Sequence, residues 1–262
     1  MELTSTTLFP PRIFYPDANA WMDSSKLAFK HPVEIYLDTV EISGSQLPSS
    51  QRLCFLIEPR DFRHKASNSM VLKSAKSFEA IITYDPEILS KCPNSIFLPY
   101  GTTWINPENY GDALRKKPNV SFLCGGKKFL EGHLLRQKIW SRRSDFGENV
   151  DFWGSSQMPP EDTAGVKQLA AEGGAKATLM ESQFHIAVEN SKIPNYFTEK
   201  LIDCLITRTV PVYWGCPNLS EFFNPKGIIV FQTDDELKDL CDGLSSSLYQ
   251  SLRPYIDENE AI

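Results

Sequence analysis

The sequence lacks the features that define several large classes of protein. No segment approaches the ~20 consecutive apolar residues of a transmembrane helix, and residues 1–16 hold neither a basic leader nor an apolar run of signal-peptide length. The net charge of −6 argues against a general binder of nucleic acids or anionic membranes. We therefore expect a soluble or cytoplasmic chain that has no signal peptide or membrane anchor and does not bind nucleic acid.

Paired cysteines and the sequence signatures of common catalytic loops are absent as well. None of the six cysteines forms a C-x-x-C pair and they lie in apolar runs, which favours buried, reduced thiols. The four histidines lack the spacing of metal ligands. There is no G-x-G-x-x-G, G-x-x-x-x-G-K-[ST] or G-x-S-x-G, so dehydrogenases, P-loop enzymes and the usual serine hydrolases lack their signatures.

The sequence does contain the pattern of a globular α/β protein. Hydrophobic residues make up 41% of the 262 residues, and 18 prolines with 14 glycines indicate many short elements joined by tight connections. Strand-like apolar runs alternate with helical spacing, first over residues 33–101 and again beyond residue 119. This alternation predicts crossover connections and parallel sheets.

The chain composition turns polar at residues 116–119, which predicts two tandem α/β domains, residues 1–116 and 117–262. The prediction allows the last helix to pack back on the first domain. Ligands bind at the carboxyl ends of the strands in such sheets, so we expect two crevices that face each other across one cleft. The predicted strands are residues 33–42, 53–57, 80–84, 96–98, 120–124, 150–153, 184–188, 210–214 and 227–231. The predicted helices are residues 69–78, 86–89, 132–143, 161–172, 198–206, 219–223 and 234–244.

Polar and charged residues follow the predicted strand 184–188, within residues 184–206. A buried strand ends in Glu189 and Asn190, and Thr198, Glu199 and Lys200 then open an amphipathic helix. Thr198 is a favourable N-cap, and a helix N-terminus flanked by a lysine can bind an anion such as a nucleotide diphosphate. A well-capped helix without a ligand is the alternative interpretation.

A longer motif surrounds these residues. The run E-N-S-x-x-P-x-Y-x-T-E-K is followed by the apolar helix, then by T-V-P-V-Y-W-G and N-P-K, all within residues 184–226. This segment resembles the C-terminal signature of glycosyltransferase family 10, the α-1,3/α-1,4-fucosyltransferases. The resemblance implies a GT-B fold, in which two Rossmann-like α/β domains face an interdomain cleft. It also implies GDP-fucose as donor and inversion at the anomeric carbon.

The resemblance places donor-binding roles on five residues of the second domain. Asn190 and Tyr196 fall on donor-binding positions, Glu199 would hold ribose or fucose hydroxyls, and Lys200 would hold the phosphates. Arg136, on the helix that follows the first strand of this domain, best fits a further diphosphate-binding arginine. For the other basic residues of this region, a solvated helix face is the simpler interpretation; they are Lys127, Lys128, Lys138, Arg142 and Arg143.

Glu58, which follows the second predicted strand, fits the family's general base. An inverting transfer needs one base for the acceptor proton and cations where the leaving diphosphate gathers charge. The alternative is a structural carboxylate paired with Arg60 or Arg63. Because no D-x-D occurs near a strand end and Lys200 and Arg136 supply positive charge, we expect no metal and no cofactor beyond the donor substrate.

Together these features predict an inverting, metal-independent glycosyltransferase that acts on a nucleotide sugar and a glycan hydroxyl. L-Fucose from GDP-fucose is the favoured donor. Another donor such as UDP-xylose, or a non-catalytic carbohydrate-binding relative, remains an alternative. A glycoside hydrolase would need two carboxylates facing one sugar, and the sequence does not locate such a pair.

Overall fold

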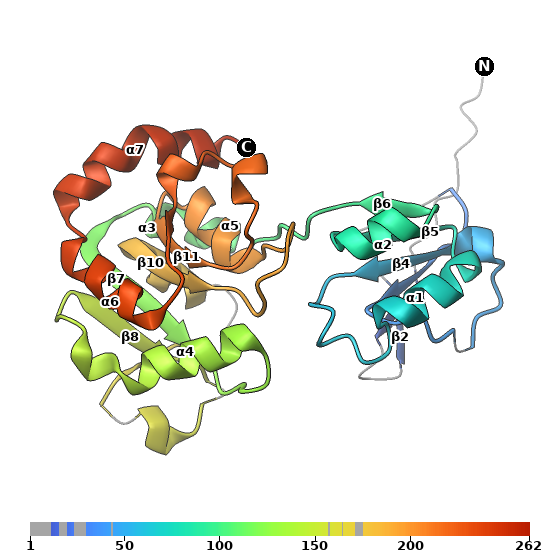
Figure 1. Cartoon of the computed structure of the whole chain (residues 1–262), viewed down its shortest axis with the longest axis horizontal. Coiled ribbons are helices and arrows are strands. Elements are labelled where there is room, and N and C mark those ends of the chain that lie inside the picture. Colours follow the sequence, from blue (N-terminus) through green and yellow to red (C-terminus); the bar gives the residue numbers. More distant parts are fainter. Residues whose placement is uncertain are drawn as a thin grey trace. The chain divides into compact units, whose positions relative to one another are not determined.

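The computed structural model describes residues 12–15, 20–23, 30–42, 44–156, 158–163, 165–170 and 175–262. The chain divides into two compact units, residues 1–100 and residues 101–262. Each unit contains one six-stranded sheet with helices, so the predicted α/β class is confirmed (Figure 1).

Unit 1 is built on a sheet of order β2-β1-β3-β4-β5-β6. β1 and β2 pair antiparallel, and every other neighbouring pair is parallel. The strands are β1 (Arg12–Tyr15), β2 (Ala20–Asp23), β3 (Glu34–Leu37), β4 (Arg52–Leu56), β5 (Ala80–Thr83) and β6 (Ser95–Phe97). The helices are α1 (Asn68–Ser74) and α2 (Pro86–Lys91), with 3-10 helices η1 (Ser49–Gln51) and η2 (Ala75–Ser77).

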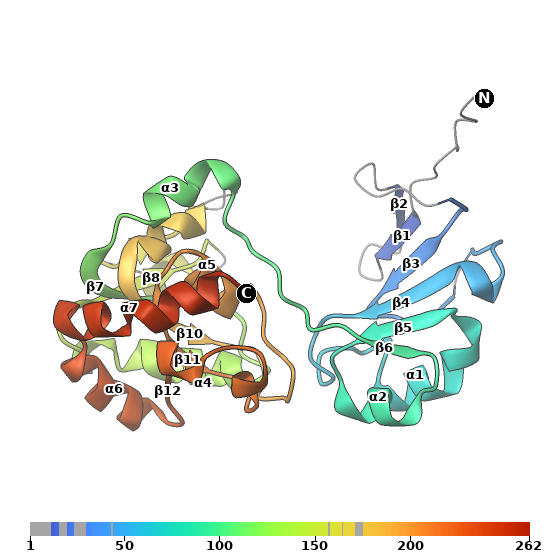
Figure 2. The same ribbon diagram turned by 90° about the horizontal axis from the view of Figure 1, so that it is seen from above.

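The core of unit 1 forms where α1 and α2 cover one face of the sheet (Figure 2). Val71 of α1 and Ile88 of α2 pack there with buried strand residues such as Cys54. α2 begins as the sequence predicts, because the Asp85 side chain accepts a hydrogen bond from the Glu87 amide and a proline follows at the first helical position.

Unit 2 is built on a wholly parallel sheet of order β12-β11-β10-β7-β8-β9. The strands are β7 (Lys117–Cys124), β8 (Val150–Gly154), β9 (Lys167–Gln168), β10 (Ser182–Val188), β11 (Val210–Trp214) and β12 (Ile229–Val230). The chain adds strands outward from β7 on one side and then returns to build outward from β10 on the other. The order therefore reverses between β7 and β10, and a doubly wound sheet binds its ligand at such a reversal.

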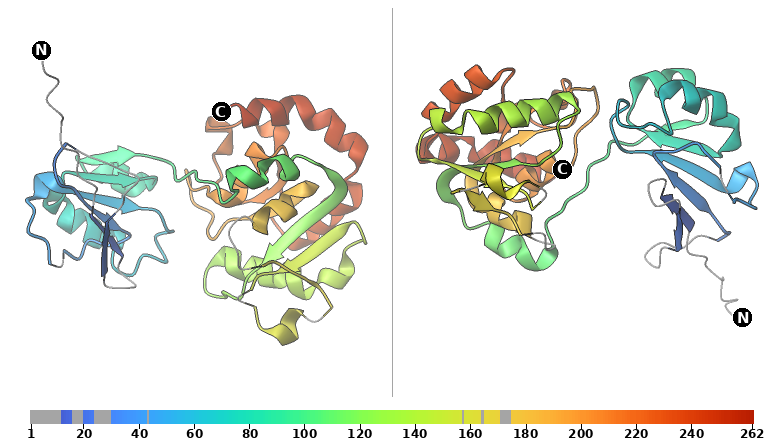
Figure 3. Two further views of the ribbon diagram at one scale, coloured as in Figure 1. Left: turned by 180° about the vertical axis from the view of Figure 1, so that it is seen from behind. Right: turned by 90° about the horizontal axis from the view of Figure 1, so that it is seen from below.

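Helices cover both faces of this sheet (Figures 2 and 3). One core joins the sheet to α4, α6 and α7, and the other joins it to α5 and η6. The helices are α3 (Tyr110–Ala113), α4 (Glu131–Ser141), α5 (Glu199–Ile206), α6 (Asp234–Gly243) and α7 (Ser246–Glu260). The 3-10 helices are η3 (Pro107–Asn109), η4 (Arg143–Asp145), η5 (Pro160–Thr163), η6 (Ala175–Glu181), η7 (Leu219–Glu221) and η8 (Pro225–Gly227).

The structure divides the chain after Tyr100, earlier than the boundary predicted near residue 116. The segment that follows Tyr100 is tied to unit 2 by packing and by hydrogen bonds. The Thr103 hydroxyl and the Trp104 amide both donate to Oδ1 of Asp203, at 2.7 and 2.9 Å, and Ile105 is buried in the core around α5. The polar composition at residues 116–119 instead marks the start of β7.

One expectation within unit 2 needs correction. No long helix spans residues 161–172: η5 ends at Thr163 and β9 forms at Lys167–Gln168, while residues 171 and 172 lie outside the described part. Gly165 has φ +77°, which interrupts a helix, and β9 pairs with β8 instead. The last helix, α7, packs on unit 2, where its Tyr249 and Ile256 are buried in the core beside β10.

All six cysteines are buried thiols, as the sequence predicts. Among the described residues, no helix has both the length and the apolarity needed to cross a bilayer.

Candidate functional site in unit 2

Glu189, directly after β10, is the centre of the candidate site. β10 is buried along its whole length between β7 and β11, and Glu189 is 0% exposed at its carboxyl end. Its carboxylate accepts hydrogen bonds from the Thr198 amide at 2.8 Å and from the Thr198 hydroxyl at 2.7 Å. Burial raises the pKa of Glu189, although the charge of Lys200 works against this. The two hydrogen bonds lock the end of β10 to the start of α5.

The N-terminus of α4 closes on the same strand end. The Gly132 amide donates to the Asn190 carbonyl at 3.0 Å, and a Cβ at Gly132 would lie 1.7 Å from the Glu189 carbonyl oxygen. Only glycine permits this approach. It brings Arg136, one turn further along α4, to the residues after β10. The Arg136 guanidinium donates to the Asn190 side-chain oxygen at 2.8 Å and also to the Val188 carbonyl.

The N-terminus of α5 gathers opposite charges. Thr198 caps the helix by accepting from the Lys200 amide, as predicted. The Lys200 ammonium lies 3.0 Å from Oε1 of Glu199 and 3.9 Å from the Glu189 carboxylate. Lys176 of η6 reaches the same Glu199 oxygen at 3.4 Å. Burial disfavours the charged form of Glu199, but the two lysines outweigh it and bring its pKa to about 2.

Tyr196 is placed by the loop that connects β10 to α5. Its side chain is buried, with 1% of its surface exposed. The loop turns at Asn195, whose φ of 65° is left-handed, a conformation that asparagine tolerates well. The backbone amide of Asn195 donates to Oδ1 of Asn218, and the side-chain amide of Asn218 donates to Oδ1 of Asn195, both at 2.8 Å. These two hydrogen bonds hold the loop against the segment after β11. Tyr196 therefore contributes here as a buried residue of the loop.

The structure thus brings Arg136, Asn190, Tyr196, Glu199 and Lys200 together at the end of β10 and the start of α5, within unit 2. Cationic groups and helix N–H groups there can bind an anion, and a carboxylate and an amide can bind hydroxyls. A ligand that carries both phosphates and sugars suits this combination.

Sequence reasoning missed three residues near the site. His133 is buried at the start of α4, where burial and then the charge of Arg136 lower its pKa to about 4. Lys176 pairs with Glu199, and its ammonium lies 4.0 Å from the centroid of the Trp104 ring. No local motif marks any of the three, because each is distant in the chain from residues 184–206 and comes near them only when the chain folds.

The other basic residues of the α4 region divide into groups. Lys127 and Lys128 are exposed, as expected for a solvated face. Lys138 is 2.6 Å from Asp234, and Arg142 pairs with Asp234 and Asp235 at the N-terminus of α6. The last two are therefore ion-paired between helices rather than simply solvated.

Glu58 lies in unit 1, two residues after β4 ends. Its amide donates to Oδ1 of Asp38 at 3.1 Å, and its carbonyl accepts from the Tyr84 hydroxyl at 3.0 Å. The structural alternative was a pair with Arg60 or Arg63. Both arginines form ion pairs with Asp85, at 3.4 and 3.3 Å.

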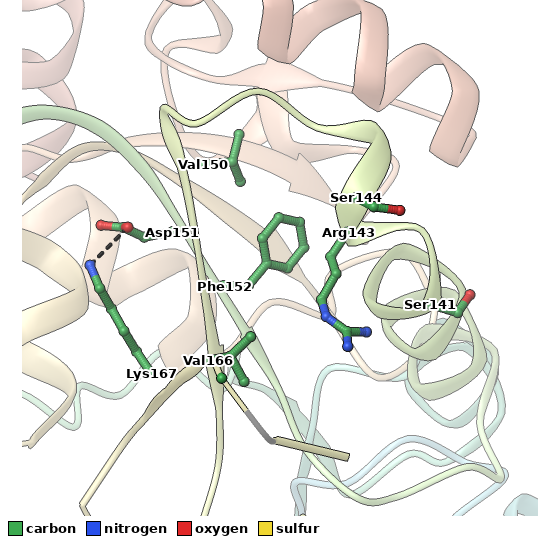
Figure 4. A pocket seen from close by; sticks show the side chains of 9 residues that line it. Ser141, Arg143, Ser144, Val150, Asp151, Phe152, Val166 and Lys167 are labelled. Carbon is green, nitrogen blue, oxygen red and sulfur yellow. Dashed lines mark ion pairs between the residues drawn. The ribbon is translucent and has the colours of Figure 1, made fainter. Parts of the chain in front are cut away.

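A separate pocket of about 590 Å³ lies elsewhere in unit 2, between the end of α4 and the start of β8 and β9 (Figure 4). Phe152 and Val166 lie beside the Arg143 side chain there, while Asp151 and Lys167 form an ion pair of 2.8 Å. None of its lining residues is a predicted site residue. In the described ranges, no group of three or more histidine, cysteine, aspartate or glutamate side chains is arranged to hold a metal ion.

Comparison with known proteins finds relatives of this part of the chain. Residues 133–255 match the model of Glycosyltransferase family 10 (fucosyltransferase) C-term. The alpha-(1,3)-fucosyltransferase FucT of Helicobacter pylori is 39% identical over 51 residues, which cover 20% of this chain and 11% of that protein. Alpha-(1,3)-fucosyltransferase B of Drosophila melanogaster is 35% identical over 83 residues, which cover 29% of this chain and 19% of that protein. The matches thus span less than a fifth of either relative.

A solved structure extends the likeness of the fold beyond this segment. The crystal structure of an alpha1,3-fucosyltransferase with GDP-fucose matches 87% of this chain and 69% of that chain, with a TM-score of 0.55 and 17% sequence identity. At this identity the likeness concerns the fold alone, and it confirms the predicted GT-B class. The family match and the site agree in position, because residues 133–255 include all five residues that meet at the end of β10 and the start of α5.

Proposed function

We propose that this chain is an inverting, metal-independent glycosyltransferase that moves L-fucose from GDP-fucose onto a hydroxyl of a glycan. The observation that carries the proposal is the Glu199–Lys200 pair at the N-terminus of α5, inside the segment that matches the family. The fucosyltransferase of similar fold was solved with GDP-fucose, which supports this donor.

Lys200 and Arg136 are the proposed phosphate ligands. Lys200 belongs to the first turn of α5, where helix N–H groups add positive potential, and Arg136 reaches the end of β10 from α4. Charge develops on the diphosphate as it leaves, so cations fixed in advance stabilise the transition state more than the ground state. These two side chains and the helix would supply the charge that a metal ion supplies in other transferases.

Glu199 and Asn190 are the proposed ligands of the donor hydroxyls. Glu199 is ionised over the whole physiological range, because the neighbouring lysines hold its pKa at about 2. An ionised carboxylate accepts hydrogen bonds only and binds a hydroxyl through that hydroxyl's proton. Tyr196 completes the set by shaping the loop between β10 and α5.

Glu58 is the proposed general base. The acceptor oxygen attacks the anomeric carbon while the bond from that carbon to the diphosphate breaks and its electron pair leaves with GDP. Glu58 takes the hydroxyl proton of the acceptor in the same step. A single displacement of this kind inverts the anomeric configuration, which NMR of the product can compare with that of the donor.

A thermal-shift panel with GDP, UDP, GDP-fucose and UDP-sugars tests the donor. We expect stabilisation by GDP and GDP-fucose, and Lys200→Ala should abolish or strongly weaken it. Lys238→Ala is the matched control, since Lys238 is on α6 and pairs with Asp242 at 2.9 Å. Stabilisation by UDP but not GDP would favour a donor such as UDP-xylose, and the absence of any nucleotide effect would contradict the transferase proposal.

A transfer assay separates the remaining alternatives. Nucleotide binding without transfer to any of a panel of glycans would favour a non-catalytic carbohydrate-binding relative. Activity that EDTA abolishes and Mg²⁺ restores would contradict metal independence.

A further inference from the structure

Two lysines from different elements converge on one carboxylate oxygen. The Lys200 ammonium of α5 is 3.0 Å from Oε1 of Glu199, and the Lys176 ammonium of η6 is 3.4 Å from the same atom. All three side chains are mostly buried, with Glu199 10% exposed and Lys176 19% exposed. Ion pairs at such sites are screened less than those on the surface.

The Trp104 ring also contacts the Lys176 ammonium. Its centroid is 4.0 Å from the Lys176 ammonium, within the range of a cation–π contact. The Trp104 backbone is in turn fixed to α5, because its amide donates to Asp203 at 2.9 Å. Asp203 follows Glu199 by four residues on the same helix face. Lys176 is therefore confined between α5 and a segment that α5 itself anchors.

In the proposed function, Lys200 interacts with two anionic groups. It is one counter-ion of Glu199 in the structure without ligand, and it is the proposed ligand of the donor diphosphate. A phosphate that draws the Lys200 ammonium toward itself weakens its hold on Glu199. A buried carboxylate that loses its counter-ion is costly, and its protonation becomes easier.

We propose that Lys176 is a positioning residue that keeps Glu199 ionised and in place when Lys200 turns to the diphosphate. Trp104 restricts Lys176 to this position. The inference rests on the proposed function, because it takes Glu199 as a ligand of the donor hydroxyls. It extends that function to two residues outside the motif of residues 184–226.

The charged and titratable groups near Glu199 come from every element packed around it. They are Lys200 and Asp203 on α5, Lys176 on η6, Glu189 after β10 and Arg136 on α4. Removing Lys176 takes away one of the two cations that lower the pKa of Glu199, while the effect of burial, which raises it, remains. The pKa of Glu199 should then rise, most of all when Lys200 is drawn to the diphosphate. Donor binding that needs the carboxylate should weaken in mild acid.

GDP-fucose binding by calorimetry at pH 8 and pH 5 tests this inference. Lys176→Met should weaken binding by about threefold at pH 8 and by a larger factor at pH 5, relative to the wild type at each pH. Lys176→Arg should restore most of the affinity, because it keeps the cation. Trp104→Ala should shift affinity in the same direction by a smaller factor.

Lys226→Met is the matched control. Lys226 is an exposed lysine of unit 2 whose ammonium lies 5.3 Å from the Tyr255 ring centroid, so the substitution removes a similar charge and ring contact. It should leave affinity unchanged at both pH values.

Two results would overturn the inference while leaving the proposed function intact. These are wild-type affinity in Lys176→Met, or an equal loss at both pH values, as a merely structural role would produce. A wild-type protein that fails to bind GDP-fucose at either pH would overturn the proposed function and this inference with it.

Discussion

The Asp38 carboxylate accepts a hydrogen bond from the backbone amide of Glu58 at 3.1 Å. The same oxygen accepts from the Ile57 amide at 2.8 Å, and the Tyr84 hydroxyl donates to the Glu58 carbonyl at 3.0 Å. Asp38 itself has φ 49°, a left-handed conformation that aspartate and asparagine adopt more readily than alanine does. The backbone of the proposed base is thus held from β3 and β5, the two neighbours of β4.

This arrangement predicts that Asp38 acts on transfer through Glu58. Asp38→Ala removes the acceptor and strains the backbone, so kcat should fall by about tenfold or more while the Kd for GDP-fucose stays the same. Asp38→Asn keeps both an acceptor oxygen and the tolerance for positive φ, and should retain most of the activity. Equal kcat values in the alanine variant and the wild type would contradict the prediction.

Glu58→Gln tests the base directly. The amide keeps the size of the side chain but cannot take a proton, so transfer should fall by about 10²–10⁴-fold. Calorimetry should show GDP-fucose binding unchanged, since the donor residues lie in unit 2. Full turnover in this variant would show that another group accepts the proton.

Gly132→Ala tests the contact that joins α4 to the end of β10. The new Cβ would lie 1.7 Å from the Glu189 carbonyl oxygen, which is backbone and cannot move aside cheaply. We expect a loss of about 1–3 kcal/mol in the free energy of unfolding and weaker GDP binding, because Arg136 moves with α4. Gly243→Ala at the end of α6 is the control, since a Cβ there meets nothing within 4 Å. Unchanged stability and GDP affinity in Gly132→Ala would show that the close contact between α4 and the end of β10 does not need glycine.

Asp203→Asn should change the pH dependence of stability. Burial raises the pKa of Asp203 from its usual 3.8 to about 6, so the folded state binds a proton more tightly than the unfolded state does. The contribution of Asp203 to the free energy of unfolding of the wild type therefore falls as pH rises from about 4 to about 6 and stays lower above that.

Asparagine cannot ionise and keeps an oxygen for the Thr103 hydroxyl and the Trp104 amide. Urea unfolding should show Asp203→Asn more stable than the wild type by up to about 2 kcal/mol at pH 8, with the difference shrinking near pH 4. Asp239→Asn, at an exposed position of α6, should stay within about 0.5 kcal/mol of the wild type at both pH values. A pH-independent difference for Asp203→Asn would contradict the assignment.

Local chemistry explains which elements the sequence predicts correctly. The start of α2 at Asp85-Pro86 and the start of α5 at Thr198 depend on caps and first-turn residues that lie next to each other in the chain. β5, β10 and β11 are apolar runs whose burial follows from their composition. The longer prediction for residues 161–172 was wrong because β9 forms by pairing with β8, and no local window contains that partner.

The residues of the site divide in the same way. Asn190, Glu199 and Lys200 lie in one continuous motif, so the sequence could identify them together. His133, Lys176 and Trp104 come from three other segments and carry no motif of their own. The unit boundary after Tyr100 likewise depends on Asp203, about a hundred residues away in the chain, which binds the segment after Tyr100 to α5.

The sequence by itself determined the α/β class, the family signature of residues 184–226 and the capped start of α5, because each depends on neighbouring residues. Only the tertiary structure decided that the strand order reverses between β7 and β10, that Glu189 is buried as the link between β10 and α5, and that Lys176 joins Lys200 on Glu199. The physical reason is that strand order and ion pairing are set by contacts between distant segments. Those contacts form only when the hydrophobic faces of the sheet and its helices are buried together.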